Sequence, residues 1–174
     1  MKKILFVFLL LFELTVQAQV QRNFWGLELG RSTRSEVKSF LSSSNLQFED
    51  NFSGLDAIDV TDLKELPLGG YSWSVTFMFY NNILCYINLL RTSIGFSMTT
   101  AETYEIDTKH IFHDLRGKLN NKYGTLEDPL GQSQNHYVRR DLQTVVELEL
   151  NNGDVILRYY DRKLARASVK GNDL

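Results

Sequence analysis

The clearest pattern of hydrophobic and polar positions lies between residues 71 and 90. From Tyr71 to Phe79 every second residue is aromatic or apolar and most residues between them are small or polar, which predicts a strand over residues 71–80. Asn81 and Asn82 follow, and asparagine tolerates the positive φ angles of a tight hairpin turn. Residues 83–90 are therefore predicted to return as the second strand of a β-hairpin.

The two faces of this hairpin differ in their side chains. Counting outward from the turn gives one mainly aromatic face, with these cross-strand pairs: Phe79 with Leu84, Phe77 with Tyr86, Val75 with Asn88 and Trp73 with Leu90. The other face is partly apolar, and its residues are candidates for binding a partner: Thr76, Met78, Ile83, Cys85 and Ile87. We expect either a partner or another part of the chain to cover this second face.

Two capping-box patterns predict where helices begin. Residues 33–36 predict a helix of about ten residues, with Val37 and Leu41 on its apolar side. Residues 99–102 predict a longer helix that runs to Tyr123 and stops at Gly124. An apolar stripe recurs every four residues in the longer helix and predicts packing on a sheet: Ile111, Leu115, Leu119 and Tyr123.

A second hairpin is predicted near the end of the chain. A strand over residues 134–140 precedes two alternating segments joined at Asn152 and Gly153. The predicted inner face has Val146, Leu148 and Leu150 across from Val155, Leu157 and Tyr159, and the outer face has Glu147 opposite Arg158 and Glu149 opposite Ile156. Residues 46–52 and 57–63 predict two weaker strands, and residues 165–174 lose periodicity and are predicted to fray.

These elements predict an α+β fold of two similar halves, at about residues 23–95 and 96–164, within one domain over residues 19–174. Each half is a helix followed by an antiparallel hairpin, and the helices are expected to pack on one face of the sheet. Tight hairpin turns join neighbouring antiparallel strands and cannot form parallel crossovers, so a βαβ arrangement is excluded.

The first 18 residues predict an export signal. Lys2 and Lys3 precede an apolar run over residues 4–12, and the segment ends in the small-residue pattern at Ala18 that signal peptidase recognises. The run is too short for a retained transmembrane helix. A lipid anchor is not predicted, because no cysteine lies near Ala18. We expect a bacterial protein that is periplasmic or secreted after cleavage near Ala18.

Charge and cysteine content narrow the function classes. Without residues 1–18 the chain has 17 basic and 20 acidic residues, a formal charge of −3, and this overall balance predicts binding neither to nucleic acid nor to an anionic membrane. Cys85 is the only cysteine, so no intramolecular disulfide can form. Two alternatives remain open for its thiol, which is either buried as a small apolar group or available to bridge two chains.

One cluster has residue types suited to chemistry. His110, His113 and Asp114 are spaced to lie on one side of the second helix, and two imidazoles with a carboxylate could bind zinc or a similar metal. The alternative is an ordinary solvated helix surface, since no fuller metalloprotease motif is present. No other pattern indicates a cofactor or a catalytic residue, so an enzyme is the less favoured class.

Several residues resemble a known class of proteins. The first part of the predicted domain resembles the beginning of small envelope modules similar to β-lactamase inhibitory proteins and outer-membrane assembly lipoproteins. The residues that carry this resemblance are Phe24, Leu27, Gly30 and the capped helix with Val37 and Leu41. Later residues resemble a sequence pattern of many exported bacterial proteins: Leu119, Lys122, Tyr123, Gly124, Pro129 and residues 156–160. The lipobox cysteine of the lipoprotein branch is missing, so the anchoring of that branch does not carry over.

The resemblance implies a helical layer on an antiparallel sheet, sometimes doubled, and a binding or scaffolding role without chemistry. The leading hypothesis is therefore an exported noncatalytic protein that binds another envelope or extracellular protein. The alternatives are a small metal-dependent enzyme using His110, His113 and Asp114, and an inhibitor of an extracellular hydrolase. The sequence specifies neither the partner nor the oligomeric state.

Overall fold

The computed structural model describes residues 19–50, 56–60, 66–97, 102–129, 131 and 135–171. The chain is α+β, and its described helices are α2 (Arg34–Ser43), α3 (Thr108–Tyr123) and α4 (Arg162–Gly171). The strands, in chain order, are β1 (Asn23–Phe24), β2 (Leu27–Glu28), β3 (Phe48–Asp50), β4 (Ala57–Val60), β5 (Leu66–Leu68), β6 (Tyr71–Tyr80), β7 (Ile83–Arg91), β8 (Ile94–Ser97), β9 (Glu102–Glu105), β10 (His136–Arg140), β11 (Thr144–Asn151) and β12 (Asp154–Asp161).

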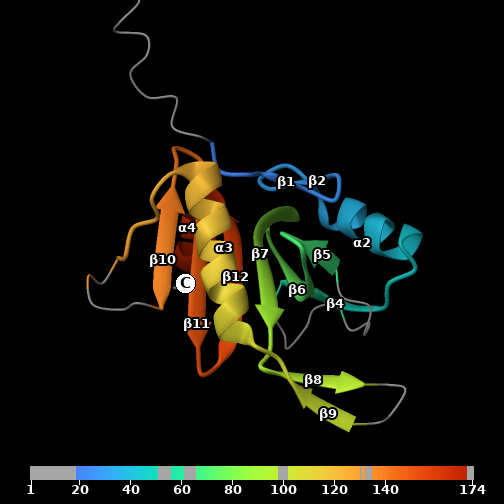
Figure 1. The fold of residues 1–174 in the computed structure, drawn as a ribbon. Coiled ribbons are helices and arrows are strands. Elements are labelled where there is room, and N and C mark those ends of the chain that lie inside the picture. The colour runs from blue at the N-terminus through green and yellow to red at the C-terminus, as the bar shows by residue number, and fades with distance from the viewer. Residues whose placement is uncertain are drawn as a thin grey trace, which may run out of the picture.

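One large antiparallel sheet organises the molecule. Its strand order is β10-β11-β12-β7-β6-β4-β3, and β5 also pairs with β6. The returning strands of the two hairpins, β7 and β12, pair with each other from Tyr86–Tyr160 to Arg91–Val155, so both hairpins share one sheet (Figure 1). Two short ribbons, β1–β2 and β8–β9, lie outside it.

Helices α2 and α3 cover the same face of this sheet. Their apolar side chains and the inward side chains of the strands form a single core cluster, which includes Val37, Leu41, Trp73, Val75, Phe77, Ile87, Leu89, Phe112, Leu115, Leu119, Val146, Leu148, Leu157 and Tyr159. In Figure 1, α3 lies across β10, β11 and β12, whereas α2 lies near the other end of the sheet. We refer to the covered side of the sheet as the core face.

Several predicted local structures are confirmed. Thr33 caps α2, and its side chain and that of Glu36 form the reciprocal bonds of a capping box. Asn81 and Asn82 have φ angles of 50° and 65° in the turn between β6 and β7. The second hairpin also has the predicted register, with Leu148 opposite Leu157 and Glu147 opposite Arg158.

The predicted register of the first hairpin is wrong beyond its turn. Phe79 does pair with Leu84, but a β-bulge follows, and Met78 pairs with Tyr86 and Phe77 with Ile87. Cys85 is the extra residue on β7. Because side chains alternate along a strand, one inserted residue moves every later side chain to the opposite face.

Two helix predictions also need correction. Glu102 does not begin a helix but lies in β9, and α3 begins at Thr108, where the Asp107 side chain accepts a hydrogen bond from the His110 backbone N–H. Residues 165–171 do not fray but belong to α4. This third helix does not share the core face with α2 and α3; it borders the opposite face, where it lies beside Val145 and Tyr160.

Some predictions fall partly or wholly outside the described residues. The predicted weaker strands correspond to β3 and β4, but residues 51–52 and 61–63 are outside the described ranges. The same holds for residues 99–101 of the second capping box, for residues 172–174 and for the export signal over residues 1–18. In the ranges that are described, no helix has both the length and the apolar character that crossing a bilayer requires.

Candidate binding surface

The side of the sheet opposite the core face is not covered by α2 or α3, and we call it the outer face. Strand register defines its centre, where Asn88 of β7 pairs with Arg158 of β12, and Arg158 pairs with Glu147 of β11. Further residues of these strands complete the outer face: Tyr86, Leu90, Val145, Glu149, Ile156 and Tyr160. The outer face therefore combines residues from both hairpins.

Arg158 is held at the centre of the outer face by two carboxylates. Its guanidinium nitrogen Nη1 lies 2.5 Å from Glu149 Oε2 and 3.8 Å from Glu147 Oε2. The Arg158 side chain is only 22% exposed. Burial opposes its charge, but the hydrogen bond to Glu149 and the nearby negative groups outweigh burial and raise the pKa of Arg158. The guanidinium is thus fixed in position before any partner binds.

Two stacked tyrosines lie beside this ion pair. The rings of Tyr86 and Tyr160 are 5.4 Å apart and within 7° of parallel. The Tyr160 hydroxyl donates a 2.7 Å hydrogen bond to Glu147 Oε1. Burial raises the pKa of Tyr86 to about 12, and burial together with the Glu147 hydrogen bond raises that of Tyr160. Both hydroxyl groups therefore remain neutral donors at physiological pH.

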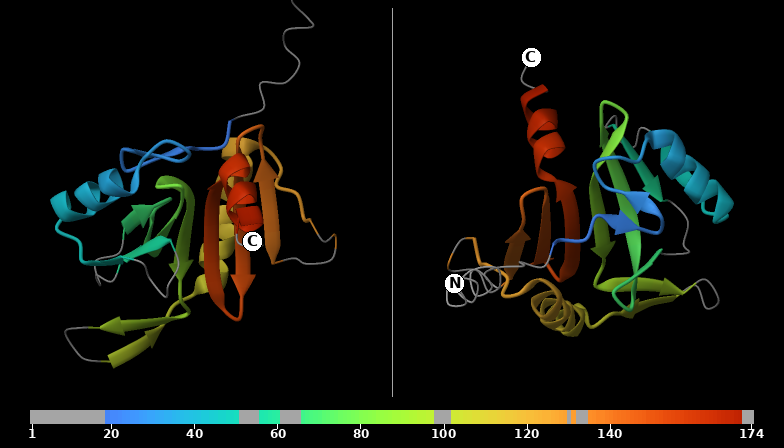
Figure 2. Two further views of the ribbon diagram at one scale, coloured as in Figure 1. Left: turned by 180° about the vertical axis from the view of Figure 1, so that it is seen from behind. Right: turned by 90° about the horizontal axis from the view of Figure 1, so that it is seen from above.

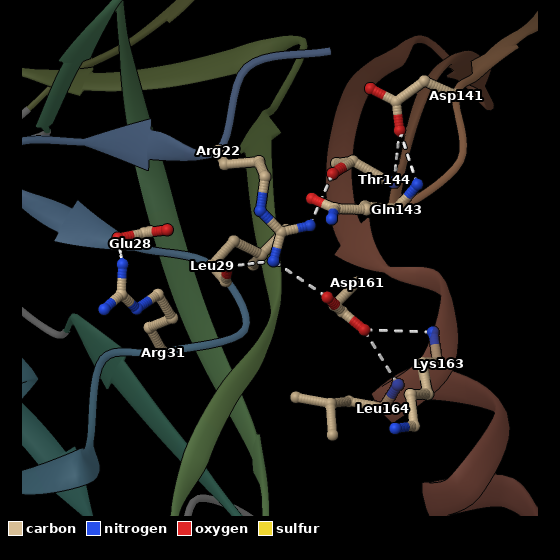
Figure 3. A network of polar contacts seen from close by, with 10 residues as sticks. All are labelled: Arg22, Glu28, Leu29, Arg31, Asp141, Gln143, Thr144, Asp161, Lys163 and Leu164. Carbon is tan, nitrogen blue, oxygen red and sulfur yellow. Dashed lines mark hydrogen bonds and ion pairs between the residues drawn. The ribbon is translucent and has the colours of Figure 1, made fainter. Parts of the chain in front are cut away.

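A separate polar network connects the N-terminal segment to the end of the sheet (Figure 3). Arg22 donates hydrogen bonds to the Leu29 carbonyl, to Thr144 Oγ1 and to Asp161 Oδ2. Asp161 also accepts hydrogen bonds from the backbone N–H groups of Lys163 and Leu164, which lie in the first turn of α4. A cavity of about 590 Å³ adjoins this network.

Intramolecular partners account for this network. The side chains of Arg22 and Asp161 are 16% and 12% exposed and neutralise each other at 2.9 Å. Asp141 accepts hydrogen bonds from the backbone N–H groups of Val20, Gln143 and Thr144. We call this network the clamp, and its role is to attach the segment before β1 to β11 and β12.

The structure separates the five residues predicted to bind a partner. Ile87 is fully buried and points to the core face, and Cys85 is 3% exposed. Thr76 and Met78 lie on the outer side of β6, where Thr76 Oγ1 donates to Asp59 Oδ1. Ile83 lies at the turn and forms a bridge with Thr33. The five residues therefore do not form one surface, because the prediction rested on the unbulged register.

The predicted metal residues lie on the exposed side of α3. His110 and His113 are exposed. Asp114 already has two partners, the Tyr71 hydroxyl at 2.7 Å and Lys118 Nζ at 2.6 Å, and the hydrogen bonds from Lys118 and Tyr71 lower its pKa. Among the residues that are described, no three His, Cys, Asp or Glu side chains come close enough to hold a metal ion.

Tyr86, Asn88 and Leu90 were not among the predicted binding residues, because the unbulged register places them on the mainly aromatic face of the hairpin. One signal could have identified the error. The unbulged register places the Asn88 amide opposite Val75 in an apolar layer, and a buried amide without a hydrogen-bond partner is strongly disfavoured. Moving Asn88 to the outer face requires one extra residue between the turn and Asn88, and that residue is Cys85.

Comparisons with protein-family models, with curated proteins and with solved structures found no match to this chain.

Proposed function

We propose that the chain is an exported noncatalytic protein that binds another protein of the bacterial envelope or the extracellular space through its outer face. The observation that carries this proposal is the half-buried group of Arg158, Tyr86 and Tyr160 on the outer face. Helices α2 and α3 leave this face uncovered, and α4 borders it beside Tyr160. Tyrosine and arginine are enriched among the residues that dominate binding energy in protein interfaces.

The rigidity of the group supports this function. Its side chains belong to paired strands, and each has a fixed neighbour, either a ring or a carboxylate. Binding through such side chains loses little conformational entropy, because they are already ordered in the free protein. Glu147 and Glu149 could resemble a catalytic carboxylate pair, but Arg158 and Tyr160 already engage them.

The arrangement of the strands supports the proposed relation between two similar halves. Each half places a helix before its hairpin, and the hairpins meet along β7 and β12. In this proposal, the duplicated unit has no complete outer face by itself, since Tyr86 comes from one hairpin and Tyr160 from the other. The resemblance to β-lactamase inhibitory proteins and assembly lipoproteins agrees with a binding role for such a face.

Affinity capture with matched variants tests the proposal. The tagged protein is used to capture a partner from its native envelope, and the affinity of the identified partner is then measured for Tyr86→Ala and Leu90→Ala. We expect at least one of these variants to lose about 30-fold in affinity, as is usual for a binding hot spot. His113→Ala is the matched control, because it removes an exposed ring from the helix on the other side of the sheet.

Melting curves show that each variant is folded before its affinity is interpreted. Folded outer-face variants that keep full affinity would contradict the proposal, as would an equal loss in the control. The export component is tested separately by N-terminal sequencing of the mature protein, which is expected to begin at Gln19. A mature protein that still begins at Met1 would contradict export by this signal.

A further inference from the structure

The surface around α4 carries an unusual pair of exposed side chains. Leu142 is 95% exposed and Val169 is 66% exposed, and they are the strongly exposed large hydrophobic residues among those described. Both lie at pockets formed with α4. Scattered exposed apolar residues are common, but these two adjoin the same helix.

Basic side chains lie between the two exposed residues. The pocket at Leu142 has a volume of about 430 Å³ and the pocket at Val169 about 420 Å³, and Arg162 and Arg166 line both of them. Lys163 adds a charge to the first pocket and Arg140 to the second. Among the described residues that line these pockets, none is acidic. The surface is therefore strongly basic, although the chain as a whole has a formal charge of −2.

The carboxylates around this surface are engaged elsewhere. Glu28, which lines the cavity at the clamp together with Leu142 and Lys163, pairs with Arg31. Asp161 pairs with Arg22 and caps α4. Asp141 accepts backbone hydrogen bonds in the clamp, and its carbonyl accepts a 2.5 Å bond from Arg162. Glu147 accepts from Tyr160 and lies near Arg158. The basic side chains of α4 are thus left to attract an external anion.

The position of α4 makes this surface accessible. Figure 2 shows α4 on the side of the sheet opposite α3, and in the view from above it extends outward from the end of β12. Arg162, Lys163 and Arg166 fall on one side of the helix, whereas Leu164, Ala165 and Ser168 fall on the other. The helix is therefore amphipathic, with a basic side and a side of mainly small apolar residues.

We propose that α4 and Leu142 attach the protein to the surface of a membrane that contains anionic phospholipids. Basic side chains attract the lipid phosphates, and neighbouring exposed apolar side chains enter the headgroup region; this combination is typical of interfacial helices. The charge of the surface selects anionic lipid rather than neutral lipid. Such attachment is peripheral and requires no spanning helix. The surface adjoins the outer face at Val145 and Tyr160, which line one of its pockets.

Sedimentation with lipid vesicles tests this inference on the protein without its predicted signal. We expect binding to vesicles of phosphatidylcholine mixed with phosphatidylglycerol, weaker binding to phosphatidylcholine alone, and a decrease with added salt. The double variant Arg140→Gln, Arg166→Gln is expected to bind the anionic vesicles about 25-fold less tightly, since each basic residue near such a surface contributes about fivefold. Neither arginine forms an ion pair with the described residues, so folding should not depend on them.

Two further variants sharpen the test. Lys109→Gln removes an exposed charge from α3 and is expected to bind as the unmodified protein does. Leu142→Ser is expected to weaken binding without changing the preference for anionic lipid. Equal binding to both vesicle types, or folded Arg140→Gln, Arg166→Gln protein with unchanged binding, would overturn the inference. The inference would also be overturned if the parent protein did not bind vesicles and the double variant lost affinity for a protein partner. That result would assign the surface to protein binding.

Discussion

At the scale of single residues, Cys85 determines which side chains of β7 reach the outer face. It is the extra residue of the bulge, it is 3% exposed, and its Sγ donates a 3.4 Å hydrogen bond to the Met78 carbonyl. Of the two alternatives that the sequence left open, a buried thiol is the one that the structure has. A bridge between two folded chains would require this strand to open.

The thiol of Cys85 is therefore predicted to be unreactive in the folded protein. Burial, with a smaller contribution from Asp56, raises its pKa from 9.0 to about 12. At pH 8 we expect labelling by a thiol reagent to be far slower in the native state than in denaturant. Rapid native labelling, or a disulfide-linked dimer of folded protein, would contradict this prediction.

The same pKa shift predicts how stability depends on pH. The folded-state pKa is raised, so the folded state retains a proton that the unfolded state loses above about pH 9. The contribution of Cys85 to stability should be constant below pH 9 and should be lost as the pH rises from 9 toward 12. Cys85→Ala provides the comparison in urea unfolding curves at pH 7 and pH 10, because it removes this titration.

At the scale of elements, the bulge decides which residues of β7 are core. Ile87 is fully buried opposite Phe77, whereas Asn88 is half-buried on the outer face. We expect Ile87→Ala to lower the free energy of unfolding by about 2–5 kcal/mol through loss of apolar contacts and creation of a cavity. Asn88→Ala should cost about 1 kcal/mol or less.

Urea unfolding of the two variants measures this difference. Under the unbulged register the order would be reversed, with Asn88 in the core and Ile87 tolerant of substitution. The comparison therefore tests the position of the bulge as well as the two side chains. A larger loss for Asn88→Ala than for Ile87→Ala would show that the register of β7 is misassigned.

The elements also show what sequence patterns can specify. Hairpins with Asn-containing turns were predictable because alternation and turn chemistry agree, and the second register was correct because no bulge interrupts it. The start of α3 was misplaced because two acceptor side chains, Thr99 and Asp107, compete as candidate caps in the sequence. Helix α4 was missed although it is amphipathic, because only Leu164 and Val169 among its apolar residues are large.

At the scale of the whole molecule, the outer face could not be predicted from sequence because it depends on a long-range pairing. Strand β7 meets β12, and only this pairing brings Tyr86 beside Tyr160. The pattern within each hairpin contains no information about which of its edges will pair. The clamp depends likewise on contacts between the first and last parts of the described chain, and no local motif indicates them.

Gly30 is predicted to be essential to the clamp. Its φ is +83°, and a Cβ atom there would lie 2.3 Å from Arg22 Nη2 and 2.7 Å from Asp161 Oδ2. Gly26 has a similar φ of +86° but no atom within 4 Å of such a Cβ. Gly26→Ala should therefore cost about 1–2 kcal/mol from backbone strain alone, and Gly30→Ala about 3 kcal/mol or more, because it also separates the buried ion pair.

Unfolding in urea distinguishes the two effects, since both substitutions add the same methyl group at a positive φ. Equal losses for Gly26→Ala and Gly30→Ala would mean that the contact between Arg22 and Asp161 contributes little to stability. A larger loss at Gly30 would locate the difference in the clamp itself.

The clamp also affects the order in which contacts form during folding. Val20 bonds to a residue 121 positions later in the chain, and Arg22 to one 139 positions later. Contacts of such long sequence separation form late, since most of the chain must be ordered or at least available before their ends can meet. During translation, the N-terminal end of the chain is synthesised first. Until residue 161 has been synthesised, Arg22 cannot form its ion pair with Asp161, so the clamp can be completed only after nearly all of the described chain has been made.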